Sequence, residues 1–226
     1  MHFKTFYVFK TDSKILKLDF ELYLMSLDDD NFLVWDPKYN LSPSDFRKEF
    51  DDKKSAIPGQ MDRTAVSFLA LIPYFELDFT KDFKKFSFKN IKLLTIFVRD
   101  MSFFDLQKTK DENRTPKEID FLILHEQGHF DLAEYLRPKL ETYCSSLCKG
   151  HLFETNGSTQ NEIEIFARNH AHDYLDPIIK KINEDNKQAQ MIYDKYTDHG
   201  RRVKKQLEYN QKWANFRKIK SLKKSN

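Results

Sequence analysis

His125 and His129 are the strongest candidates for chemistry in this chain, because the pentapeptide His-Glu-Gln-Gly-His places them four residues apart. On an α-helix, such positions lie about 40° apart around the axis, so both imidazoles can reach one metal ion. Glu126 lies about 100° from His125, close enough to contact a water molecule on that ion without binding the ion itself. A histidine pair with an adjacent carboxylate suits Zn²⁺ and general-base catalysis. The spacing therefore predicts a zinc hydrolase site with His125 and His129 as ligands and Glu126 as the base.

A zinc site of this kind needs a third protein ligand, and the sequence offers two sources. Glu162 and Glu164 are candidates from a later helical segment. His199 is the other candidate, because a histidine followed by glycine is typical of a helix end, where a side chain can turn back toward the core. Glu134 lies about 180° around the helix from His125 and is expected to point away from the site.

Two sequence motifs resemble those of a known family. The segment LHEQGHFDLAE at residues 124–134 is followed by YDKYTDHG at residues 193–200, and then by Gln206 and Trp213. This pattern is similar to that of the bacterial DUF922 family of predicted zinc-dependent proteases, over residues 35–213. The resemblance implies a zincin-like metallopeptidase that holds Zn²⁺ and cleaves a peptide or protein substrate. It also implies His199, rather than Glu164, as the third ligand.

The second motif contains further polar residues that we assign roles near the metal. Tyr193 is predicted to be catalytic, donating a hydrogen bond to the oxyanion of the tetrahedral intermediate. Asp194 or Asp198 is predicted to accept the other N–H of a ligand imidazole. For each of these residues, packing or capping at a helix end is the alternative.

The helix that carries the pentapeptide is predicted from its start signal and its apolar content. Residues 115–118 (Thr-Pro-Lys-Glu) form a capping box with proline at the first helical position. Apolar residues at 119 and 121–124 cover almost every side, which is typical of a buried helix. Pro138 is expected to kink or end it. Further helices are predicted at residues 161–196, with an interruption near Pro177, and at residues 201–218.

The first hundred residues favour strands instead. Residues 17–24 alternate strictly between apolar and polar side chains, and residues 64–79 and 86–98 are rich in β-branched and aromatic types. Pro73 is expected to break the second run, residues 41–50 to hold a short helix, and residues 107–114 to form a loop. Strands followed by helices predict an α+β fold, with a mostly antiparallel sheet preceding the helical half that carries the site.

Length and charge favour one domain over residues 1–226, with a β-rich part at 1–106, a helical part with the metal site at 115–218 and a basic tail at 219–226. The scarcity of glycine, five residues in all, argues against glycine-rich phosphate loops. No apolar run is long enough for a transmembrane helix, and charged residues interrupt any signal-peptide core near the N-terminus. Cys144 and Cys148 are too few for a disulfide framework, and with His151 they are a weak alternative metal site.

Positive charge is concentrated at the C-terminal end. Residues 201–226 hold ten Lys or Arg and one Glu, a net charge of +9, so the other 200 residues carry −6 of the total of +3. A basic helix with Val203, Leu207 and Trp213 on one side favours, as the alternative function, a non-catalytic zinc-containing module that binds nucleic acid or an anionic membrane surface. Docking of this apolar side on the domain is the simpler interpretation, and for that reason we expect no nucleic-acid partner.

Overall fold

The computed structural model describes residues 31–48 and 64–224, so the strand predicted at residues 17–24 lies outside the described residues. The strands are β1 (Phe32–Val34), β2 (Ala65–Val66), β3 (Leu69–Phe79), β4 (Lys85–Val98), β5 (Phe103–Phe104) and β6 (Phe153–Glu154). The helices are α2 (Leu106–Asp111), α3 (Pro116–Cys148), α4 (Gln160–Thr197) and α5 (Val203–Lys224), with 3-10 turns η1 (Pro43–Asp45) and η2 (Arg99–Met101). The order of elements confirms the predicted α+β class.

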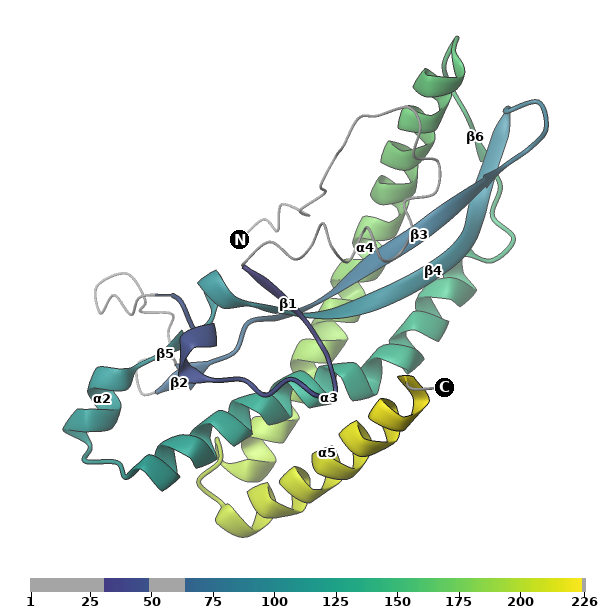
Figure 1. The fold of residues 1–226 in the computed structure, drawn as a ribbon. Helices are drawn as coiled ribbons and strands as arrows, with labels where there is room; N and C mark the ends of the chain where they lie inside the picture. The colour runs from purple at the N-terminus through teal and green to yellow at the C-terminus, as the bar shows by residue number, and fades with distance from the viewer. Residues whose placement is uncertain (1–30, 49–63, 225–226) are drawn as a thin grey trace.

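A long antiparallel hairpin of β3 and β4 forms the body of the sheet (Figure 1). β1 pairs with β4 on its other side, and the short β6 also pairs with β4. Pro73 does not break β3, contrary to the expectation from sequence. The N–H of Leu71 points out of the sheet edge to Asn183 Oδ1, so the ring nitrogen of Pro73, two residues on, lies on the same outward side and interrupts no ladder bond.

α3 begins as predicted, with the Thr115 side chain accepting from the N–H of Glu118 and the Glu118 side chain accepting in return. Pro138 does not end the helix, which continues to Cys148. Full burial starts later than the sequence predicts. Leu124 is 48% exposed, whereas every residue from 125 to 134 is buried. This buried stretch is the part of α3 that carries the pentapeptide.

α4 and α5 enclose α3. The central helix α3 packs against β4 on one side and against α4 and α5 on others, while α4 also covers β3 (Figure 1). α4 runs without interruption through Pro177, and α5 continues to Lys224, past the predicted end at residue 218. α2 overlaps the segment 107–114 that we expect to be a loop. No helix in the described parts of the chain is long and apolar enough to cross a membrane.

The packing contacts at the α3–α4–α5 junction differ from those of the main core. Leu71, Leu93, Cys144 and Ile182 belong to an apolar cluster between the hairpin and the two long helices. At the junction, by contrast, Leu132 and two aromatic side chains, Tyr193 and Trp213, form a smaller cluster. Polar side chains lie beside this smaller cluster.

Candidate metal centre

His125 and His129 lie one helical turn apart on α3 and turn toward α4. Their ring centroids are 4.8 Å apart, and the two Nε2 atoms are separated by 3.2 Å. Both residues are buried. The pairing predicted from the spacing of the pentapeptide is therefore present.

Asp194 of α4 completes a group of three potential ligands. Its Oδ1 lies 3.2 Å from Nε2 of His125 and 3.0 Å from Nε2 of His129. Within the described residues, this is the one group of three or more histidine, cysteine or acidic side chains arranged to hold a metal ion. We call His125, His129 and Asp194 the triad. Sequence reasoning considered Asp194 only as a partner for a ligand's other N–H, but its carboxylate faces the converging Nε2 atoms.

The charge balance of the triad depends on protons or on a cation. Burial acts to raise the pKa of Asp194, but the hydrogen bonds from His125 and His129 outweigh it and hold that pKa well below its usual range. Burial likewise acts to lower the pKa of His129, and the adjacent Asp194 reverses the direction and raises it. Two buried imidazoles and a carboxylate attract positive charge to the point where their atoms meet.

The distances within the triad fit Zn²⁺. A tetrahedral zinc ion with ligand atoms about 2.1 Å away holds those atoms about 3.4 Å from one another. The three separations in the triad are 3.0 to 3.2 Å. Two imidazoles and one carboxylate are also a donor set that zinc accepts while keeping a position open for water. The residues present therefore fit the ion that the sequence predicts.

Both imidazoles are held on the opposite edge by glutamine side chains. Nδ1 of His125 lies 2.9 Å from Oε1 of Gln206, and Nδ1 of His129 lies 2.7 Å from Oε1 of Gln190. These are the positions where sequence reasoning placed Asp194 or Asp198. Gln206 appears in the C-terminal motif, but its contact with His125 could not be read from the sequence.

Tyr193 packs against both histidines. Its ring stacks on His125 at a centroid distance of 5.0 Å and meets His129 edge to face at 4.8 Å. The hydroxyl accepts from Gln206 Nε2 at 2.8 Å and lies 3.4 Å from the backbone oxygen of His125. Burial raises the pKa of Tyr193. These contacts favour a positioning role, and the oxyanion contact predicted for Tyr193 stays a prediction.

Two glycines allow the close packing around the triad. A Cβ atom on Gly128 would lie 2.2 Å from the Tyr193 hydroxyl oxygen, so no larger residue fits between α3 and this ring. Gly200 has a φ of +82°, and its Cβ would lie 3.3 Å from Cβ and Cγ of His125. Both positions therefore require glycine, one for space and the other also for its left-handed backbone.

Glu126 is buried beside the triad and has one hydroxyl partner. Ser67, between β2 and β3, donates to Oε2 of Glu126 at 2.6 Å. The charge of Glu126 contributes to the raised pKa of His129, after the larger effects of burial and Asp194. The hairpin side of the fold thus contacts the residue predicted to act as base.

The remaining predicted ligands lie in different surroundings. His199 follows the end of α4 as expected, is exposed, and places Nδ1 3.3 Å from Oδ1 of Asp194, so its role as a ligand stays a prediction. Glu162 caps the N-terminus of α4. Glu164 lies thirty residues before Asp194 on the same helix, which at 1.5 Å per residue is about 45 Å away. Neither glutamate can join the triad.

The weaker metal-site alternative at the cysteines has no such convergence. Cys144 and Cys148 are buried in the apolar cluster between the hairpin and the long helices, whereas His151 is exposed and contacts aromatic rings. The neighbouring Cys148, together with burial, raises the pKa of Cys144. These thiols belong to the core of the described structure.

Comparison of the chain with family models, curated proteins and solved structures finds no match. The resemblance to the DUF922 family therefore gains no support beyond the residues that carry it.

Proposed function

We propose that this protein is a zinc-dependent metallopeptidase, with His125, His129 and Asp194 as ligands and Glu126 as general base. The observation that carries the proposal is the convergence of two Nε2 atoms and one carboxylate oxygen in a buried group, with a second carboxylate adjacent on α3. When bound there, Zn²⁺ supplies a Lewis acid that lowers the pKa of water toward about 7 and polarises a carbonyl group.

Side chains of the protein then carry out proton transfer and positioning. Glu126 accepts the proton of the attacking water and returns it to the leaving amine. Because Ser67 donates to Oε2, we assign proton acceptance to Oε1. Tyr193 keeps the two imidazoles in place through ring contacts on both. The substrate is a peptide or protein, as the resemblance implies.

Metal content and hydrolysis test the two halves of the proposal separately. The purified protein should contain about one zinc per chain, and Asp194→Asn should lose it, whereas Asp185→Asn, a partly exposed aspartate on the same helix, should keep it. Glu126→Gln should keep zinc and lose roughly 10²- to 10⁴-fold in cleavage of a peptide library followed by mass spectrometry. Asp120→Asn, on the exposed face of α3, is its matched control. Full activity in Glu126→Gln would refute the mechanism.

His199 distinguishes an open site from a closed one. Three protein ligands leave a position for water, whereas four close the site and make it structural. X-ray absorption at the zinc edge should count three protein ligands and a water molecule if the proposal is right. Four protein ligands, with one imidazole signal lost in His199→Ala, would favour the non-catalytic module.

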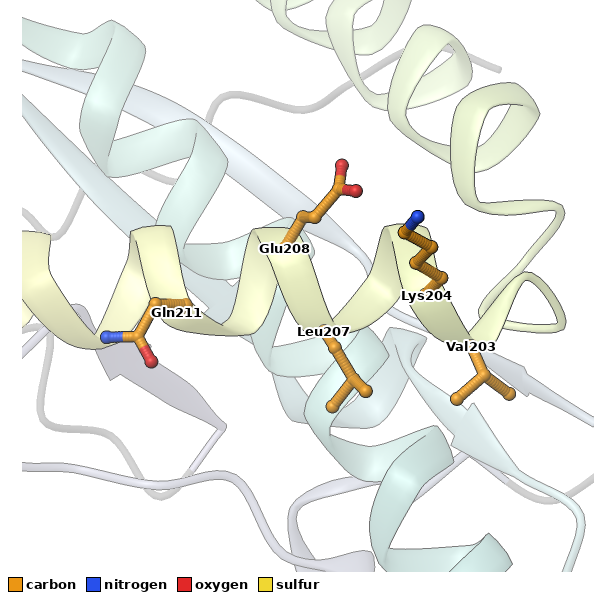
Figure 2. A pocket seen from close by; sticks show the side chains of 5 residues that line it. All are labelled: Val203, Lys204, Leu207, Glu208 and Gln211. Atoms are coloured by element: carbon orange, nitrogen blue, oxygen red, sulfur yellow. The ribbon is translucent and has the colours of Figure 1, made fainter.

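One observation supports a second candidate function, binding of an anionic membrane surface. Val203 and Leu207 on α5 are more than half exposed, and with Lys204, Glu208 and Gln211 they line a shallow surface hollow whose side chains point away from the helix (Figure 2). Trp213 is buried instead, so the arrangement of all three apolar residues on one side, expected from the sequence, is wrong. α5 docks through a different face from the one in Figure 2.

Vesicle sedimentation tests this candidate. If α5 binds membranes, the protein should sediment with vesicles of phosphatidylcholine and phosphatidylglycerol but not with phosphatidylcholine alone. Leu207→Ser should weaken that sedimentation, and Leu152→Ser, at a leucine that is also more than half exposed and lies between α3 and β6, should not. Equal sedimentation with both kinds of vesicle would refute an electrostatic role for α5.

A further inference from the structure

The two glutamines that contact Nδ1 of the histidine rings, Gln190 and Gln206, indicate which ring nitrogens carry hydrogen. A histidine that binds a metal through Nε2 must carry its hydrogen on Nδ1, and the partner of Nδ1 decides which tautomer is present. Here each Nδ1 faces an amide oxygen, one from α4 and one from α5. The orientation of these amides can be derived from the groups around them.

The Gln190 amide is oriented by a backbone oxygen. Its Nε2 donates to the carbonyl oxygen of His129 at 3.1 Å and to Oδ1 of Asn186 at 3.1 Å. A backbone carbonyl can only accept, so the NH₂ group of Gln190 must face it. The other end of the amide, Oε1, is then the atom that faces Nδ1 of His129.

The Gln206 amide is oriented by a longer chain of hydrogen bonds. The Tyr193 hydroxyl donates to the backbone oxygen of His125 at 3.4 Å or to Gln206 Oε1 at 3.3 Å. The hydroxyl oxygen accepts from Gln206 Nε2 at 2.8 Å, and this Nε2 also donates to Oδ1 of Asn210 at 2.7 Å. Oε1 of Gln206 is left to face Nδ1 of His125.

We infer that Gln190 and Gln206 are positioning residues that keep a hydrogen on Nδ1 of both histidines, so that Nε2 of each ring is the atom that meets Asp194 and can exchange its proton for a metal ion. An amide oxygen can only accept, so each Nδ1 must be the donor. The metal part of this inference rests on the proposed function, whereas the hydrogen on Nδ1 is a property of the metal-free protein.

The use of amides has a consequence for the charge of the site. With glutamine on both rings, Asp194 supplies the single negative charge among the triad residues. A divalent ion held there keeps a net charge of about +1 on the three ligands, which preserves its strength as a Lewis acid. A glutamate at either position would still accept from Nδ1 but would add negative charge beside the rings.

Nuclear magnetic resonance of the metal-free wild-type protein tests the inference directly. Long-range ¹H–¹⁵N spectra of histidine-labelled protein should report hydrogen on Nδ1 of both His125 and His129. A ring with no hydrogen on Nδ1 would overturn the inference. Nδ1–H on both rings without any zinc binding would support it and refute the proposed function, so the two failures are distinguishable.

Variants test whether the glutamines cause the tautomer. In Gln190→Leu, His129 should populate both tautomers and zinc affinity should fall about 10- to 100-fold. Gln190→Glu, which still accepts, should restore Nδ1–H. Gln188→Leu, an exposed glutamine on the same helix, is the matched control and should change neither quantity. An unchanged tautomer and unchanged affinity in Gln190→Leu would overturn the inference.

Discussion

Two of the groups of buried charge along α3, one at Glu134 and one at the triad, are neutralised in different ways. Glu134 accepts from Arg137 at 2.7 Å and pairs with Lys220 of α5 at 3.2 Å. Asp194 in the triad has ion pairs with histidines alone among the described residues. The first group contains the cations that it needs, whereas the second requires a proton or a metal ion. A buried cluster whose charges are balanced by the chain's own cations is structural, whereas a cluster on the same helix that lacks a cation is a candidate functional site.

The pKa directions agree with this division. Burial acts to raise the pKa of Glu134, but Arg137 outweighs it and lowers that pKa. The carboxylate therefore stays charged inside the protein because the chain supplies the compensating cation. In the triad, the low pKa of Asp194 is accompanied by a raised pKa of His129, so the compensating charge is a proton on an imidazole and not a resident cation. Perturbing one group should therefore change stability, and perturbing the other should change metal binding.

The largest expected effect is on the complete group. Arg137→Met should leave the buried Glu134 carboxylate short of its main partner and lower the free energy of unfolding by about 3 kcal/mol. Adding Glu134→Gln to Arg137→Met should recover most of that loss, because no uncompensated charge then remains. Urea denaturation followed by circular dichroism measures both changes.

The control for Arg137 is an exposed pair. Lys181→Met breaks the contact with Asp185, in which both side chains are more than 40% exposed, and should leave the free energy of unfolding almost unchanged because solvent screens the pair. Zinc affinity should be unchanged in Arg137→Met. If Arg137→Met is no more destabilising than Lys181→Met, Lys220 alone neutralises Glu134.

The next effect concerns the incomplete group. Zinc at about 100 times its dissociation constant should raise the free energy of unfolding by about 2.7 kcal/mol, because the folded chain alone presents the triad. The increase should persist in Arg137→Met and vanish in Asp194→Asn. Mg²⁺ should give no such increase, since it prefers oxygen ligands. Equal stabilisation of Asp194→Asn by zinc would show that the ion binds elsewhere.

Local sequence signals predicted the elements that carry the triad better than the triad itself. The capping box at Thr115 and the i, i+4 histidines depend on neighbours within one turn, so α3 and its pair are confirmed. Asp194 lies 65 residues from His129 and meets it only through the packing of α4 on α3. The sequence does contain one signal of this packing. Polar and aromatic residues recur every three or four positions in α4 and so lie on one face of the helix: Asn186, Gln190, Tyr193 and Thr197.

Two prolines lie inside helices that they do not end. Pro138 was expected to kink or end its helix and Pro177 to interrupt the next one, since proline costs about 3 kcal/mol inside a helix. Pro138 and Pro177 nevertheless lie within helices of 33 and 38 residues. Both helices pack along the hairpin and along each other, and this burial outweighs the local cost. Tertiary contacts of this kind cannot be read from a short window of sequence.

The smallest expected effect compares the buried His129 with the half-buried His172. Asp194 raises the pKa of His129, whereas burial, with a smaller contribution from Arg168, lowers the pKa of His172 to about 4. Above pH 6.5 His172 is neutral in both the folded and the unfolded chain. As the pH falls from about 6.5 to 4, His172 becomes protonated in the unfolded chain but not in the folded chain. The free energy of unfolding therefore falls by about 1–2 kcal/mol after allowance for partial exposure.

His172→Phe should remove this dependence of the free energy of unfolding on pH and keep the edge-to-face contact with Phe75. His151→Phe, at an exposed histidine, is the control. An unchanged slope in His172→Phe, from urea denaturation at pH 7, 5.5 and 4.5, would show that His172 is protonated inside the fold and would remove the contrast with His129.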